Sequence, residues 1–129
     1  MPFDWSNLIE LARVLEQQSA GGRLTEALLR SAVSRAYFGA FGYANRYAVD
    51  FLQYRSRSDA DEHGRLREHL RRKKRKAVAE RLFVLRSWRN DADYLNDLPW
   101  ADVTGTVVEA IRQAQEVLAA LPPPQPRQN

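Results

Sequence analysis

The chain has 129 residues, a formal net charge of +4 and a hydrophobic fraction of 44%, and its sequence pI is about 9.8. This length and apolar content suit one globular domain and exclude disorder throughout. The absence of cysteine excludes a disulfide framework and a thiolate metal site. No segment is long and apolar enough to cross a membrane, and the N-terminus has no signal-peptide pattern, so we expect a cytoplasmic protein without a membrane partner.

Apolar residues recur at intervals of three and four along the chain, a pattern that predicts helices rather than strands. The first helix is expected over residues 5–18, with Asp4 as its N-cap. The segment from Ser19 to Gly22 is expected to end it, because glycine accepts the left-handed conformation that closes helices.

A long second helix is expected over residues 24–52, which at about 1.5 Å per residue would span about 40 Å. Its predicted buried row consists of apolar residues: Leu24, Leu28, Ala32, Ala36, Ala40, Ala44, Ala48 and Phe51. Gly39 and Gly42 lower the helix propensity by about 1 kcal/mol each relative to alanine. We expect the close approach of another helix or of another subunit to compensate.

The second half of the chain is predicted to contain a polar loop and three more helices. The loop and the next two helices are expected over residues 55–62, 63–72 and 76–94. Pro99 fits the first turn of the fifth helix, which Pro122 to Pro124 would end. We therefore predict an all-α fold, a four- to five-helix up-and-down bundle, with a single domain over residues 1–121 and a flexible proline-rich tail over 122–129.

Two segments of the predicted helices together resemble the HEPN superfamily, and in particular its small standalone prokaryotic members. Residues 30–41, RSAVSRAYFGAF, resemble the family's arginine, Ser-Arg-Ala and paired-aromatic pattern. Residues 85–94, LRSWRNDADY, resemble its arginine motif in the variant that ends in Ala-Asp-Tyr. Between them, His63 followed by Leu66 and Leu70 is similar to a short helix of the family.

The resemblance implies a HEPN-like bundle that forms a face-to-face homodimer, with the arginine motifs of the two subunits meeting in a cleft. Many members are metal-independent RNases that act as toxins or in phage defence. Small members are often encoded beside a minimal nucleotidyltransferase that neutralises them, and other members only bind. We accordingly expect an RNA- or nucleotide-binding protein, a toxin-like partner of such a transferase, with an active RNase of a toxin–antitoxin or phage-defence system as the alternative.

The chemistry of active members requires an arginine followed, four to six residues later, by a histidine. The arginine stabilises charge on a phosphate under attack by a ribose 2′-hydroxyl, and the histidine transfers protons near neutral pH. Here Arg89 and Asn90 match the start of the motif, and Asp93 and Tyr94 its end, so these four residues are the catalytic candidates. Tyr94 occupies the histidine position. A tyrosine hydroxyl is a poor base at neutral pH, because its proton leaves only near pH 10.

Basic residues supply the predicted nucleic-acid contacts, in keeping with the positive net charge. Arg35 and Arg86 are expected in the cleft, and a run of four cations, Arg71, Arg72, Lys73 and Lys74, forms a second candidate surface. The alternative interpretation of this run is a solvated turn between helices.

Structural alternatives remain open for most of these residues. Arg89 and Asp93 are spaced for an intrahelical ion pair, and Arg35 can pair with an acidic residue. Aromatic residues of the second helix, such as Phe38, are more often core residues than base-stacking residues. His63 and His69 are six residues apart and would lie on different helix faces, so we expect neither a metal site nor a cofactor.

Overall fold

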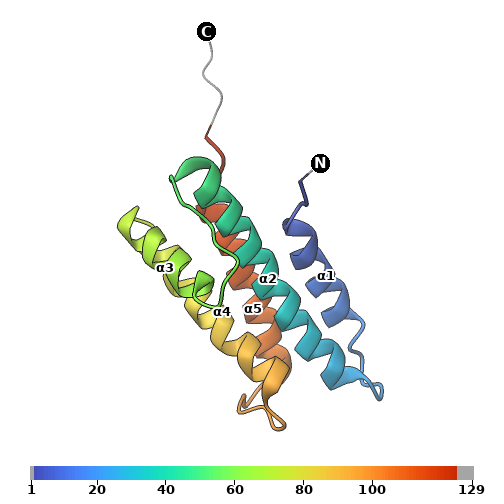
Figure 1. Cartoon of the computed structure of the whole chain (residues 1–129). Coiled ribbons are helices and arrows are strands. Elements are labelled where there is room, and N and C mark those ends of the chain that lie inside the picture. Colours follow the sequence, from blue (N-terminus) through green and yellow to red (C-terminus); the bar gives the residue numbers. More distant parts are fainter. Residues whose placement is uncertain (1, 125–129) are drawn as a thin grey trace.

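The computed structural model describes residues 2–124, and within them it contains five helices and no strand (Figure 1). The helices are α1 (Ser6–Gln17), α2 (Thr25–Phe51), α3 (Glu62–Arg72), α4 (Lys76–Tyr94) and α5 (Val103–Ala120). Figure 1 shows α1, α2, α4 and α5 alternating in direction, with the short α3 beside α4. The predicted all-α bundle is therefore confirmed. Residues 125–129 of the predicted tail lie outside the described residues.

Two helix starts differ from the prediction. The N-cap of α1 is Trp5 rather than Asp4, one residue later, although Oδ1 of Asp4 accepts a hydrogen bond from the backbone N–H of Ser6 at 3.0 Å. The prediction that Pro99 lies in the first turn of the fifth helix is wrong. That helix begins at Val103, since the Asp102 side chain accepts a hydrogen bond from the N–H of Gly105 at 2.9 Å and caps it there.

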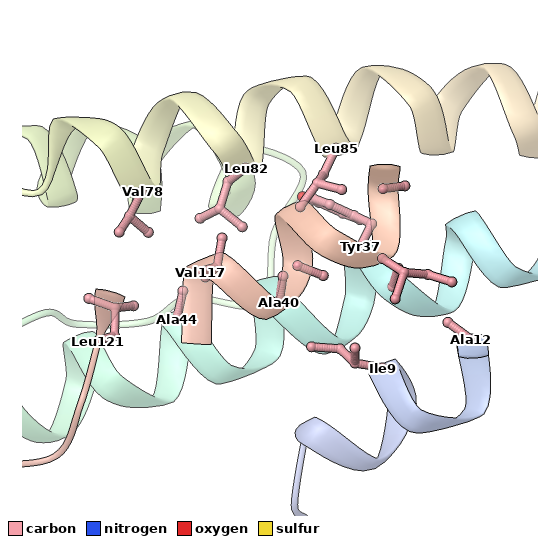
Figure 2. Close-up of a cluster of buried hydrophobic side chains, with 14 of the residues drawn as sticks. Ile9, Ala12, Tyr37, Ala40, Ala44, Val78, Leu82, Leu85, Val117 and Leu121 are labelled. Atoms are coloured by element: carbon pink, nitrogen blue, oxygen red, sulfur yellow. The ribbon is translucent and has the colours of Figure 1, made fainter. Parts of the chain in front are cut away.

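The core is formed mainly by α2, α4 and α5, with α1 packed on the outer side of α2. Figure 2 shows Val78, Leu82 and Leu85 of α4 facing the alanine row of α2 and Val117 of α5. The predicted buried row of α2 holds at its centre, where its alanines are fully buried. Its two ends were predicted wrongly: Leu24, at the N-cap position before α2, is 53% exposed, and Phe51, the last residue of α2, is 40% exposed.

The two glycines inside α2 are explained by α1. A Cβ atom on Gly39 would lie 2.7 Å from Cγ1 of Ile9, and one on Gly42 would lie 2.1 Å from a ring carbon of Trp5. Both distances are far below ordinary contact, so the backbone of α2 meets α1 closely at these positions. Of the two expected compensations, another helix of the same chain is the one found.

Replacing Gly42 with alanine is expected to lower the free energy of unfolding by about 1–2 kcal/mol. The added methyl group would displace the Trp5 ring, and overpacking of this kind outweighs the gain in helix propensity of about 1 kcal/mol. Thermal or denaturant unfolding measures the change. The matched control is Gly64→Ala in α3, where a Cβ would have only one neighbour within 4 Å. A stabilised Gly42→Ala variant would contradict the close packing.

The turn between α3 and α4 contains part of the basic run. The N–H of Arg75 bonds the carbonyl of Leu70 at 2.8 Å, and the N–H of Lys74 bonds that of Arg71 at 3.1 Å. These two bonds form a Schellman motif, with Lys74 at the position that glycine usually occupies. Its φ of 64° is left-handed, a conformation that costs a residue with a Cβ atom of order 1 kcal/mol.

Replacing Lys74 with glycine is therefore expected to raise the free energy of unfolding by about 0.5–1 kcal/mol, because glycine adopts the left-handed conformation without steric cost. Denaturant unfolding at equal ionic strength checks this. Lys73→Gly serves as the control, since Lys73 has an ordinary φ of −92° and gains nothing from glycine. Equal destabilisation of both variants would show that Lys74 is not strained.

Candidate functional site

The last turn of α4 brings the four catalytic candidates together around Arg89. The Arg89 Nη1 donates to Oδ1 of Asn90 at 3.0 Å, and Nη2 lies 3.5 Å from the hydroxyl of Tyr94. Its Nε is 2.8 Å from Oδ2 of Asp93. That N–H does not point at the carboxylate, so the contact is an ion pair rather than a hydrogen bond. The predicted intrahelical ion pair is present, and it also orients the guanidinium.

Two residues of α2 hold this turn in place. The Arg30 guanidinium donates to the backbone carbonyls of Ala92, Leu95 and Asn96 at 2.5–3.0 Å. These hydrogen bonds give the backbone carbonyls at the C-terminal end of α4 a donor, and the positive charge complements the negative end of the helix dipole. Ser34 donates to Oδ2 of Asp93 at 3.3 Å, so α2 also positions the carboxylate that faces Arg89. The segment of residues 30–41 thus supports the arginine motif directly.

An aromatic ring of α2 lies beneath two cations. The guanidinium carbon of Arg89 is 4.8 Å from the ring centroid of Phe38, and that of Arg35 is 5.7 Å from the same ring. Arg89 also lies 5.3 Å from the ring of Tyr94, which is 71% exposed. Cation–π contacts at these distances favour a charged, ordered guanidinium. Arg35 forms no ion pair within residues 2–124, so the alternative of a pair with an acidic residue is not found there. It shares the Phe38 ring with Arg89 and so lies beside the arginine motif.

A histidine that was not among the predicted site residues lies at the junction of α2 and α3. The His63 imidazole stacks on Phe41 with a centroid distance of 4.2 Å, and its Nδ1 is hydrogen-bonded to the buried hydroxyl of Tyr37. The charges of Arg67, Arg86 and Arg89 act on both His63 and Tyr37. We call these three residues the arginine cluster.

The arginine cluster changes the proton affinities of its neighbours. Burial, followed by the charges of Arg86, Arg89 and Arg67, lowers the pKa of His63 to about 4, so its imidazole is neutral at pH 7. Burial raises the pKa of Tyr37 to about 12, although the same arginines act in the opposite direction. Burial and the charge of Arg86 lower the pKa of Arg67.

Each member of the arginine cluster has a buried nitrogen without a hydrogen-bond partner among residues 2–124. These atoms are Nη1 of Arg67, Nε of Arg86 and Nε of Arg89. Asp93 is the one carboxylate that forms an ion pair with the cluster in this part of the chain. Buried polar groups are normally satisfied, and like charges repel, so the cluster is costly for the free protein. An anion that accepts hydrogen bonds would relieve both costs.

The predicted nucleic-acid contacts separate into two groups. Arg35 and Arg86 lie with the site around Arg89. The cations of the basic run occupy the end of α3 and the turn that follows, near the start of α4, and about 20 Å of helix separates that start, Lys76, from Arg89. Arg71 and Arg72 both lie within 3.8 Å of carboxylate oxygens of Glu68, so their charge is partly neutralised.

Arg67 and His63 are the site residues that the sequence analysis missed. Arg67 is one of several cations in a basic stretch, and the feature that distinguishes it, its position against Arg86 of another helix, requires the packed structure. The sequence pattern drew attention to the short helix that begins near His63 but not to His63 itself. The hydrogen bond of His63 to Tyr37 joins residues 26 positions apart, and no local pattern indicates it.

Comparison of the chain with protein-family models, with curated proteins and with solved structures gives no match. None of the helices described within residues 2–124 has the length and apolar character needed to span a membrane.

Proposed function

We propose that this protein is a HEPN-type RNA- or nucleotide-binding protein whose binding site is the arginine cluster with Arg35. The observation that carries the proposal is that Arg67 of α3 lies over Phe83 of α4, one turn before Arg86, and that the charges of Arg67, Arg86 and Arg89 all act on His63. Nη1 of Arg67 and Nε of Arg86 are buried and lack a partner within residues 2–124, whereas Nε of Arg89 faces Asp93. Arginine side chains match phosphate oxygens in geometry and charge. The aromatic rings of Phe38 and Tyr94 lie under Arg89, a combination of cations and rings that suits single-stranded nucleic acid.

The proposal includes a homodimer in which the α4 helices of two subunits face each other across the bound ligand. Its support is the outer face of α4, where Phe83, Val84 and Tyr94 are 39–71% exposed beside the arginines. A minimal nucleotidyltransferase is the proposed further partner, and co-purification with the product of a neighbouring gene would identify it. We place this complex in the cytoplasm.

Affinity for a fluorescently labelled single-stranded RNA pool tests the binding proposal. We expect Arg89→Ala to weaken binding at least tenfold, because it removes a phosphate contact and the group that Asp93 orients. The matched control is Arg112→Ala in α5, whose guanidinium pairs with Glu109 on the surface. RNA binding that is equal in wild type and Arg89→Ala would contradict the proposed site, and a wild-type protein that binds neither RNA nor nucleotides would contradict the proposed function.

RNA cleavage is the second candidate function, and the position of the Tyr94 hydroxyl, 3.5 Å from Nη2 of Arg89, favours it. In such a reaction the arginine cluster would stabilise charge on the phosphate under attack. The test is incubation of the RNA pool in EDTA with wild type, Arg89→Ala and Tyr94→Phe. Cleavage that Arg89→Ala abolishes would establish an RNase, and the rate of Tyr94→Phe would show whether that hydroxyl takes part. If the RNA stays intact with wild type, the RNase candidate is excluded and RNA or nucleotide binding is the function that is left.

A further inference from the structure

A groove of about 490 Å³ lies on the surface where α2, the start of α3 and the segment before α3 meet, with the N-terminal Trp5 at its edge. Its volume is within the range of small-molecule sites. The aromatic part of its lining consists of Trp5, Phe41 and His63, and two cations, Arg46 and Arg57, also line it. His63 thus belongs to the groove, and Arg67 of the arginine cluster lies one helical turn further along α3, four residues away and so on the same side of that helix.

The acidic groups that line the groove are already neutralised by protein contacts. Glu62 is only 6% exposed and accepts hydrogen bonds from Asn45, Tyr54 and Ser56, and Arg65 forms ion pairs with both Glu62 and Asp59. The groove is therefore an aromatic-walled surface with cations at its edge rather than an acidic one. Such a surface suits a flat, electron-rich ring attached to a phosphate.

The hydrogen bond between Tyr37 and His63 fixes the role of the imidazole. The Tyr37 hydroxyl is buried, and its one partner within residues 2–124 is Nδ1 of His63. If Nδ1 carried the proton, the hydroxyl hydrogen would be left without an acceptor, a cost of about 1–3 kcal/mol. The hydroxyl therefore donates to Nδ1, and the proton of the neutral ring is on Nε2. Nε2 has no partner in the described part of the chain and remains a free donor.

We propose that this groove binds the base of a nucleotide whose phosphate lies on the arginine cluster, and that Nε2 of His63 donates a hydrogen bond to an acceptor atom of that base. Trp5 and Phe41 would supply the stacking surface. The inference rests on the proposed RNA- or nucleotide-binding function and deepens it, because it separates recognition of the base from neutralisation of the phosphate. It also assigns His63 a role as a fixed donor rather than as a base.

Nuclear magnetic resonance titration of the whole protein tests the groove. The probes are uridine and adenosine 5′-monophosphates, ribose 5-phosphate and inorganic phosphate. We expect a nucleoside monophosphate to shift the Trp5 indole and His63 ring signals and to bind at least tenfold more tightly than ribose 5-phosphate. Equal affinities, or shifts confined to α4 and absent from Trp5 and His63, would overturn the proposal. Nitrogen shifts of the free protein should show His63 protonated on Nε2 alone, and protonation on Nδ1 would overturn the donor role.

Substitution of His63 separates this inference from the function on which it rests. We expect His63→Ala to weaken nucleoside monophosphate binding at least fivefold while leaving the affinity for inorganic phosphate unchanged. The control is His69→Ala, because Nε2 of His69 is bonded to the carbonyl of Leu52 at 2.6 Å and His69 does not line the groove. RNA binding that is lost in Arg89→Ala but unaffected in His63→Ala would overturn the groove and leave the proposed function standing. Nucleotide binding in the groove without any RNA binding would support the groove and narrow the proposed function to nucleotide binding.

Discussion

Replacing Glu62 with glutamine is expected to lower the free energy of unfolding by about 3 kcal/mol at pH 7. Glu62 begins α3 and joins it to α2 and to the preceding segment. Its carboxylate accepts hydrogen bonds from Asn45, Tyr54, Ser56 and the backbone of Arg57, and it forms an ion pair with Arg65 at 2.5 Å. Glutamine keeps the size of the side chain but removes the charge and one acceptor, so buried donors lose their partner.

The pH dependence of this loss follows from the pKa of Glu62. Burial by itself raises that pKa, but the hydrogen bonds from Ser56, Tyr54 and Asn45 outweigh it and lower the pKa from 4.5 to about 2. A carboxyl group with a lowered pKa in the folded protein stabilises it above the unfolded value, and the stabilisation is lost as the pH falls through the folded value. The difference between wild type and Glu62→Gln should therefore be constant above about pH 5 and shrink toward pH 2.

Denaturant unfolding between pH 2 and pH 7 measures this difference. Glu116→Gln is the control, because its carboxylate is exposed and 4.0 Å from Arg112, and we expect it to change stability by less than about 0.5 kcal/mol. A difference between wild type and Glu62→Gln below about 1 kcal/mol at pH 7, or one that does not shrink in acid, would show that Glu62 is not a structural centre.

Replacing Arg67 with methionine is expected to act on stability and on ligand binding in opposite directions. We expect the free energy of unfolding to rise by about 1 kcal/mol, since the change removes a buried nitrogen without a partner and one of several mutually repelling charges. Methionine keeps an apolar stem of similar length against Phe83. Affinity for single-stranded RNA should fall about tenfold, because one phosphate contact is lost.

Arg71→Met is the matched control for Arg67→Met. Arg71 lies one turn further along α3, is 41% exposed and lies 3.8 Å from Glu68, so its loss should change stability and RNA affinity little. Unfolding and RNA titration of the same preparations give both quantities. A destabilised Arg67→Met variant, or one with unchanged RNA affinity, would mean that the arginine cluster is a structural feature rather than a binding site.

The helices were predictable because their local signals agree with the packing. The spacing of apolar residues located all five, and Gly39 and Gly42 indicated a close helix contact before its partner was known. The start of α5 was missed because proline and aspartate both favour helix starts, and the Asp102 side chain decides between them only through its bond to Gly105.

The site was predicted in part, and the part that was missed depends on contacts between helices. Arg89 and its neighbours on α4 are close in sequence, so the motif indicated them together. The contribution of Arg67 depends on α3 lying against α4, and the role of His63 depends on its bond to Tyr37. The position of Arg30 at the end of α4 also joins residues more than 60 positions apart, which no local pattern specifies.

The salt dependence of RNA affinity tests the central claim, that the arginine cluster neutralises phosphates, most directly. The logarithm of the association constant for single-stranded RNA falls with the logarithm of salt concentration by about 0.7 for each neutralised phosphate. For wild type we therefore predict a slope of about −2 or steeper. For the variant with Arg67, Arg86 and Arg89 all replaced by methionine, we predict a slope that is shallower than the wild-type slope by about 2. A slope that is the same in both proteins, with both folded, would contradict the account.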